Sequence, residues 1–177
     1  MKNSKKSLLW QIVNEDYKQP SYVFGTMHVK DARAFKYESI VLKKIEECDA
    51  FAAEFNLEEA RLKANANSMD LPEGMQLDEM MSPKAYQRVR KMFQKQTGLE
   101  LAFFNKSQPL VITNLLTESI LSAEMPFSLD EHLFRHAKQL DKIRLGVETF
   151  EEQLEILKKI SIAVSYTHLT LPTICSV

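Results

Sequence analysis

The sequence predicts a mixed α/β (α+β) fold: a small mixed sheet with an N-terminal hairpin, parallel strands linked by helices, and a helical insert. Short runs of strand-forming residues occur near positions 10, 23, 51 and 145, and the later runs are separated by segments with apolar residues at helical spacing. With 177 residues, 45% of them hydrophobic, the chain is long enough to bury a core in one domain.

The N-terminal part predicts a β-hairpin. Residues 8–13 and 22–24 are apolar and rich in strand-forming types, and the polar residues 14–20 connect them. From Tyr37 to Cys48 the apolar residues share one face at helical spacing, and the short apolar run 49–55 follows directly. This strand–helix–strand order predicts that the second hairpin strand and the strand near residue 51 are parallel neighbours.

Residues 57–140 predict a helical insert. Ser82 and Pro83 form a helix start, with the serine as N-cap and the proline at the first helical position, and Ser128 is a second N-cap. Beyond the insert, the alternating apolar residues of segment 141–148 predict a strand, and Thr149 caps a further helix.

Composition excludes several classes of protein. The chain has 23 Lys+Arg against 24 Asp+Glu, so we expect no nucleic-acid partner. No apolar stretch approaches the ~20 residues that cross a bilayer, and the N-terminus lacks a signal-peptide core. The two cysteines, Cys48 and Cys175, are too few for a disulfide framework or a zinc ribbon. We therefore expect a cytoplasmic protein without a membrane span.

The last segment differs from the rest of the chain. Residues 161–177 contain no Asp, Glu, Lys or Arg, although 27% of the whole chain is charged. The segment is either a terminal strand or a translated adapter read-through, of the kind that ends some environmental sequences. We favour the second interpretation, which places the domain at residues 7–160 and makes residues 161–177 a non-native tail.

Gly25-Thr26-Met27-His28 follows the second predicted strand. A glycine there allows a tight turn or the close approach of another group. A histidine just beyond a strand end projects into the crevice where α/β sheets place ligands, and imidazole can bind a transition metal or shuttle a proton. The alternative is a histidine that is hydrogen-bonded in a loop without a function.

Two glutamates stand at similar positions. Glu54 follows the apolar run 51–53, and Glu148 follows Gly146 and Val147. A partly buried carboxylate at a strand end needs a partner or has a raised pKa suited to general-base work. Together with His28, the two carboxylates could hold a divalent metal ion. The alternative for each is a glutamate that faces water.

Residues 130–136 carry further polar candidates. His132 and His136 share a helix face, but the zinc motif His-Glu-x-x-His needs glutamate where Leu133 stands. We therefore expect a solvated helix face. Asp130 lies in the first turn of the same helix, where a carboxylate suits the helix dipole. The basic residues between 84 and 95 are likewise expected to face solvent.

Five segments match one family pattern in order: Leu9–Ile12, Ser21–His28, Ile45–Glu54, Ser128–Leu133 and Leu145–Thr149. Together they resemble the TraB/GumN family, which includes the Tiki-like metalloproteases. The resemblance implies a metal-dependent hydrolase acting on a peptide or a small ester. His28 would be a metal ligand, Glu54 a ligand or the base that activates metal-bound water, and Glu148 a further ligand. Gly25, Asp130 and Gly146 would support the site.

Two other functions are compatible with the same resemblance. One is a non-catalytic binding or regulatory protein that holds a peptide or haem, and the other is metal-free ester hydrolysis with His28 as the base. The family pattern contains a second Gly-x-x-His motif, but His168 is preceded by Ser165 instead of glycine. We therefore expect the chain to be the N-terminal part of a longer protein, with half of the site.

Overall fold

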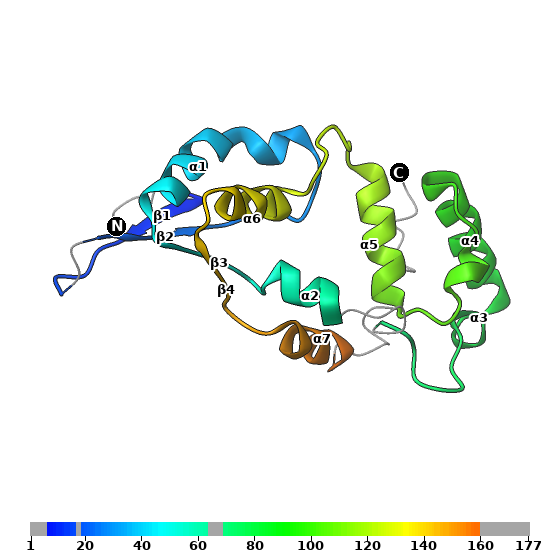
Figure 1. Cartoon of the computed structure of the whole chain (residues 1–177). Helices are drawn as coiled ribbons and strands as arrows, with labels where there is room; N and C mark the ends of the chain where they lie inside the picture. Colours follow the sequence, from blue (N-terminus) through cyan, green and yellow to red (C-terminus); the bar gives the residue numbers. More distant parts are fainter. Residues whose placement is uncertain (1–6, 17–18, 64–68, 160–177) are drawn as a thin grey trace, which may run out of the picture. The chain divides into compact units, whose positions relative to one another are not determined.

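The computed structural model describes residues 7–16, 19–63 and 69–159. They form two compact units, which are described separately (Figure 1). Of the described residues, unit 1 contains those up to Glu58 and those of Ser122–Glu148, and unit 2 contains those of Glu59–Leu121 and those from Thr149 to Lys159. Helices and strands both occur in the chain, and two of the strands pair in parallel across intervening helices, so the α/β class is confirmed. The predicted tail, residues 161–177, lies outside the described residues.

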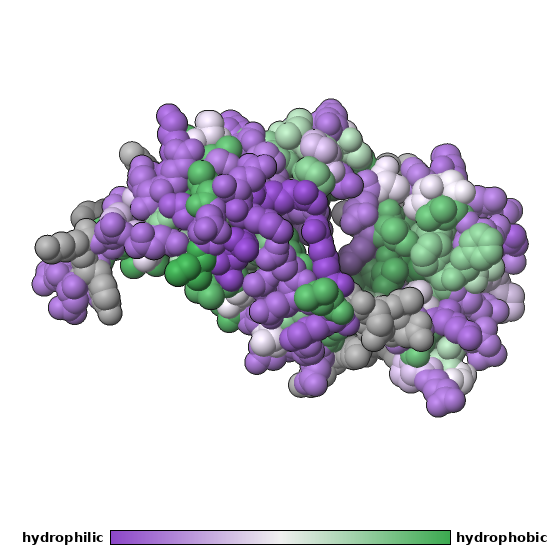
Figure 2. Space-filling view, viewed as in Figure 1, coloured by the Kyte–Doolittle hydropathy of each residue, from purple (hydrophilic) through white to green (hydrophobic). Residues whose placement is uncertain are grey.

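The predicted hairpin is present in unit 1. Strands β1 (Leu9–Ile12) and β2 (Ser21–Phe24) are antiparallel, with Leu9 opposite Phe24 and Ile12 opposite Ser21. Alternate residues of β2 are half-buried and exposed, as expected for strands covered on one face. Trp10 of the hairpin is an exposed apolar residue. Apolar residues, drawn green, also reach the surface elsewhere in the molecule (Figure 2).

The parallel pairing differs from the prediction. Strand β3 (Ala50–Ala53) pairs with β4 (Ile143–Gly146), with Ala50 opposite Ile143 and Ala53 opposite Gly146. Within the described residues the strands form two separate two-stranded sheets, β1–β2 and β3–β4, so the expected single mixed sheet with β2 beside β3 is wrong. The order of strands and helices requires a parallel partner for β3 but does not say which strand supplies it.

Helices cover the strands of unit 1. The 3-10 helix η1 (Ala32–Tyr37) leads into α1 (Glu38–Glu47), and α6 (Leu129–Gln139) packs against α1, β3 and β4. Phe51 of β3 meets Phe134 of α6 edge to face, with ring centroids 6.3 Å apart. The buried cluster between these elements comprises Phe35, Val41, Ile45, Leu129, Leu133 and Ala137.

Unit 2 is helical. Its elements are α2 (Leu57–Lys63), which starts at the boundary, α3 (Leu77–Met80), α4 (Pro83–Thr97), η2 (Leu101–Phe104), α5 (Pro109–Ile120) and α7 (Phe150–Lys159). Its buried cluster comprises Leu71, Leu77, Met81, Val89, Phe93, Leu101, Ile112 and Leu116. The predicted insert 57–140 is therefore too long, because α6 packs with the strands of unit 1 and the part of unit 2 that lies between β3 and β4 ends at Leu121.

The predicted helix start at Ser82 is confirmed. The Ser82 hydroxyl accepts a hydrogen bond from the Ala85 N–H, and Pro83 occupies the first turn of α4. Gly98 ends the helix in the left-handed region with φ 74°, which glycine adopts without a Cβ clash. These two residues therefore fix the length of α4.

Candidate functional site

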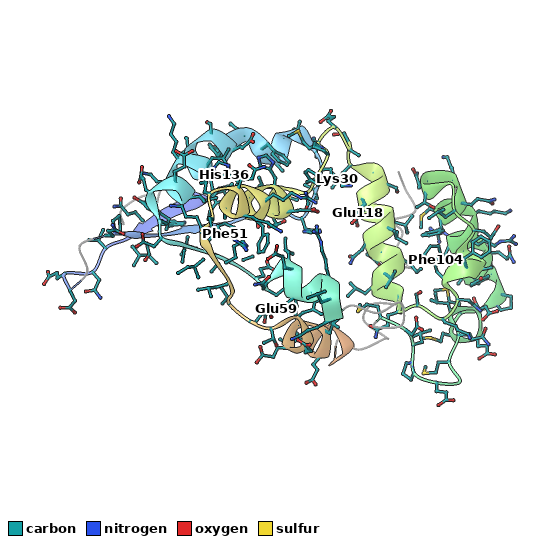
Figure 3. The ribbon with its side chains drawn as sticks, viewed as in Figure 1. Lys30, Phe51, Glu59, Phe104, Glu118 and His136 are labelled. Carbon is teal, nitrogen blue, oxygen red and sulfur yellow. The ribbon has the colours of Figure 1, made fainter. Side chains whose placement is uncertain are left out.

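Residues 122–128, here called the strap, lead into α6 and lie against the loop that follows β2. The Met125 N–H donates to the Lys30 carbonyl at 2.9 Å, and the Leu129 N–H donates to the Val29 carbonyl at 3.2 Å. Lys30 is drawn beside the first turn of α6 in Figure 3. Leu129 is buried and anchors this turn in the core of unit 1. These contacts place Thr26 and His28 next to residues 128–130.

The start of η1, which follows His28, is held by a buried carboxylate. Asp31 caps η1 and binds Arg33 through two contacts, Oδ1 to Nε at 2.8 Å and Oδ2 to Nη2 at 2.6 Å. The Arg33 guanidinium holds the pKa of the Asp31 carboxyl well below its usual range. Glu124 accepts the Ala32 N–H at 3.0 Å, which ties the strap to η1. The backbone that follows His28 is thus fixed at the start of η1.

His28 and Asp130 form the centre of the site. His28 Nδ1 lies 3.2 Å from Asp130 Oδ2, and the Thr26 hydroxyl donates to Asp130 Oδ1. Burial raises the pKa of Asp130, but the hydrogen bonds from His28 and Thr26 outweigh it, so this pKa lies below its usual value. Asp130 is therefore ionised at neutral pH and acts as an acceptor toward both partners.

Ser128 lies next to His28, a contact that the sequence did not predict. It occupies the N-cap position of α6, as predicted, yet its hydroxyl makes no capping hydrogen bond. Its Oγ lies instead 3.4 Å from His28 Nδ1, the same ring nitrogen that faces Asp130. In a Ser–His–Asp relay the serine and the carboxylate face opposite nitrogens, so Ser128 is not placed as a nucleophile of that kind.

The tautomer of His28 follows from its partners. An ionised carboxylate only accepts, so His28 Nδ1 donates to Asp130, and in the neutral ring Nε2 is then the basic nitrogen. The His28 side chain is 68% exposed, whereas that of Asp130 is 21% exposed. An exposed imidazole held by a mostly buried carboxylate can take up a proton or ligate a metal through Nε2.

The two predicted glutamates lie together at the carboxyl ends of β3 and β4. The Glu148 N–H donates to the Glu54 carbonyl at 2.9 Å, one step beyond the Val147 contact with Ala53. Glu54 is exposed and Glu148 is half-buried. The structure thus joins Glu54 with Glu148 and His28 with Asp130 in two pairs. The metal-ligand roles predicted for His28, Glu54 and Glu148 stay predictions.

The two site glycines differ in what they require. A Cβ on Gly146 would lie 2.6 Å from the Glu148 carbonyl oxygen and 2.8 Å from the Asn56 nitrogen, so no side chain fits there. A Cβ on Gly25 would lie 3.7 Å from Leu8 Cδ2, an ordinary contact. Among the described residues, Gly146 is therefore the glycine that a close approach requires, and the role predicted for Gly25 stays a prediction.

His132 and His136 do not form a solvated face. Both Nε2 atoms are buried: that of His132 lies 2.6 Å from Glu38 Oε1, and that of His136 lies 3.7 Å from Glu46 Oε1. His132 also meets the Phe35 ring edge-on, at 5.6 Å between centroids. Figure 3 places His136 on the side of α6 toward α1. The expectation of a solvated face is wrong because both histidines help to pack α6 against α1.

A family model supplies the deciding comparison. The model of the TraB/PrgY/gumN family matches residues 8–171, which is most of the chain. The chain belongs to the TraB/PrgY/gumN family. No curated protein and no solved structure matches it significantly. The family match begins one residue after the predicted domain start and extends past Ile160.

The implied metal of this TraB/PrgY/gumN chain can be tested against the residues present. In the part of the chain that the structure describes, no three His, Cys, Asp or Glu side chains are grouped so that they could hold a metal ion. Protein metal sites of the catalytic zinc type use three protein ligands. The described residues alone therefore do not fit a complete site. Separately, no helix within the described ranges is long and apolar enough to cross a membrane.

Two residues of the site were not singled out from the sequence of this family member. Thr26 holds the Asp130 carboxylate, and Ser128 faces the His28 ring. Both lie inside segments that carried the family resemblance, Ser21–His28 and Ser128–Leu133. The sequence could have indicated these contacts in one way. The two segments, although distant in the chain, belong to one family pattern and contain hydrogen-bond donors and acceptors that could pair with each other.

Proposed function

We propose that this chain carries the histidine centre of a hydrolase site, in the metal-dependent form that cleaves peptides or small esters. The observation that carries the proposal is the contact of His28 Nδ1 with Asp130 Oδ2, supported by Thr26 on the other carboxylate oxygen. Such a carboxylate fixes the ring orientation and stabilises the imidazolium that forms when Nε2 takes up a proton. Membership of the family supports the same proposal.

Each residue of the site has a separate task in this proposal. His28 offers Nε2, as the base toward a water molecule or as a ligand of the divalent ion. Asp130 is a positioning residue, since it acts through His28, and Thr26 holds Asp130 in place. Glu54 and Glu148, neighbours at the ends of β3 and β4, are the carboxylates that a metal-dependent form would draw on. A divalent ion held there would polarise the scissile carbonyl.

Hydrolysis assays test the proposal directly. The chain is assayed with a fluorogenic peptide library and with p-nitrophenyl esters, with added Zn²⁺ or Mn²⁺ and with a chelator. We expect turnover that the chelator abolishes and that His28→Ala lowers by about 10²- to 10⁴-fold, the contribution of a general base. Met27→Ala is the matched control, because Met27 is an exposed neighbour of His28. Turnover that survives His28→Ala contradicts the proposal.

A second candidate function is a non-catalytic protein that binds a peptide or haem at the same place. It is favoured by the 68% exposure of His28 together with the absence of a three-ligand group among the described side chains. An exposed imidazole can serve as an axial haem ligand. Titration with haem should then give a Soret band at one equivalent that His28→Ala removes. Catalytic turnover in the same preparation argues against this candidate.

A further inference from the structure

Helix α4 is rich in basic residues, although the whole chain has no excess of basic over acidic residues. Segment 83–97 contains five basic residues and no Asp or Glu, whereas the whole chain has a formal net charge of −1. Arg90 is neutralised by Glu100, with Nε 2.7 Å from Oε1. The other four basic side chains are exposed, and no carboxylate of the described residues pairs with them: Lys84, Arg88, Lys91 and Lys95. We call these four the α4 basic stripe.

The stripe is narrow and straight. Its members are spaced by four, three and four residues, so at ~100° per residue they fall within an arc of about 60°. The opposite side of α4 carries Val89 and Phe93, which are 1% and 0% exposed in the core of unit 2. Because the core fixes the helix about its axis, the stripe faces outward along about 16 Å. Figure 3 shows nitrogen-tipped side chains on the side of α4 away from α5.

This arrangement costs stability within the chain. Like charges three or four residues apart repel each other along a helix, as in the pairs Lys84 with Arg88 and Lys91 with Lys95. Lys84 also lies in the first turn, where a cation opposes the helix dipole. No described carboxylate compensates the repulsion, so an anionic partner outside the chain would relieve it.

The shape of the surface favours a flat partner. The stripe lies on the convex outer side of one helix, whereas proteins that bind single-stranded nucleic acid combine a positive groove with stacking aromatics. The aromatic side chains of α4, Tyr86 and Phe93, lie on its half-buried or buried side and leave none for stacking along the stripe. Clusters of four or more basic residues on a helix are typical of binding to anionic lipid headgroups.

We propose that the α4 basic stripe docks unit 2 onto an anionic phospholipid surface. The contact is electrostatic and peripheral, because the apolar side of α4 is consumed by the core of unit 2. Each basic residue near such a surface contributes a factor of about 5 in affinity. Four residues therefore raise binding by a few hundredfold over a neutral surface at low salt, and the gain falls as salt screens the charges.

Vesicle sedimentation tests the proposal with the full chain. The probes are phosphatidylcholine vesicles with and without 30 mol% phosphatidylglycerol, in about 50 mM and 300 mM NaCl, where screening differs strongly. We expect binding to the anionic vesicles only, weakened at the higher salt. The variant with all four stripe residues changed to Gln should lose on the order of 10²-fold in partitioning. Glutamine is nearly as good a helix former as lysine and removes the repulsion, so the variant should fold.

A matched control separates a specific surface from general charge. It changes four exposed lysines elsewhere to Gln: Lys30, Lys36, Lys43 and Lys106. This control should keep most of the binding, and both variants are checked by circular dichroism. Equal losses in the two variants, or no binding to anionic vesicles, overturn the proposal. Stronger binding to a DNA duplex than to vesicles at equal phosphate concentration also overturns it, in favour of a nucleic-acid partner.

Discussion

His28 and Asp130 are 102 residues apart in the sequence, yet His28 Nδ1 lies 3.2 Å from Asp130 Oδ2. The contact exists because two backbone hydrogen bonds hold the loop after β2 against the strap that leads into α6. The carboxylate in turn is fixed by Thr26. Residues from the end of β2 and the start of α6 thus form a polar cluster, whose contribution to stability can be measured.

Asp130 should stabilise the fold in a pH-dependent way. Its pKa is lowered in the folded protein, so its contribution is fully present above the unfolded value near 3.8 and is lost as the pH falls through the folded value. Asp130→Asn should therefore be less stable than the wild type at pH 6, and the difference should shrink at pH 3. Urea unfolding at the two pH values measures this, and a difference that grows on acidification contradicts the assignment.

Gly146 and Gly25 should respond differently to an added methyl group. Gly146→Ala forces a Cβ to within 2.6 Å of the Glu148 carbonyl oxygen, and such overpacking costs about 1–3 kcal/mol. Gly25→Ala meets only an ordinary contact with Leu8 and should change stability by less than about 0.5 kcal/mol. Chemical denaturation of both variants provides the comparison. Equal effects would show that the ends of β3 and β4 are less tightly packed than described.

The two serines at helix starts should also differ. Ser82→Ala removes a true cap of α4 and should cost about 1 kcal/mol of stability. Ser128→Ala removes a hydroxyl that makes no capping bond to α6, so its cost should be smaller. Its effect should appear instead at His28, as a changed chemical shift of the imidazole nitrogen Nδ1 in NMR. If Ser128→Ala costs as much stability as Ser82→Ala without affecting His28, the hydroxyl is only structural.

His132 should matter for stability and not for turnover. Its ring packs against Phe35 and its Nε2 lies 2.6 Å from Glu38, between α1 and α6. His132→Ala removes these contacts and should cost about 1 kcal/mol, the usual size of a destabilising substitution, because the side chain is only partly buried. Thermal unfolding and the hydrolysis assay together test this. A loss of turnover in a variant that remains folded would move His132 into the functional site.

Sequence patterns predicted correctly the elements that depend on interactions between residues close together in the chain. The hairpin, the start of α4 at Ser82 and the strand before Glu148 follow from turn residues, a cap and alternation, each readable within a few positions. Ser128 shows where such reading stops. Its sequence context resembles that of Ser82, but its hydroxyl faces a histidine 100 residues away, which no local pattern reveals.

The same limit explains the error in the sheet. The short runs at β2 and β3 were expected to pair because α1 lies between them, yet β3 found its partner in β4. Parallel pairs need a long crossover, and both the α1 connection and the longer path through unit 2 satisfy that requirement. The choice between them depends on how α6 packs over β3 and β4, which is a property of the assembled core.

The pairing of Ala50 with Ile143 across 93 residues also bears on the order in which the protein folds. The contacts among α3, α4 and α5 of unit 2 are local in sequence and can form early, since nearby contacts close fast. On the ribosome, β3 emerges well before its partner strand is synthesised. The backbone hydrogen-bonding groups at the edge of β3 then remain without their partner strand while residues 59–121 of unit 2 are synthesised. During that interval nascent unit 1 is the part most exposed to mispairing with other chains and to chaperone capture.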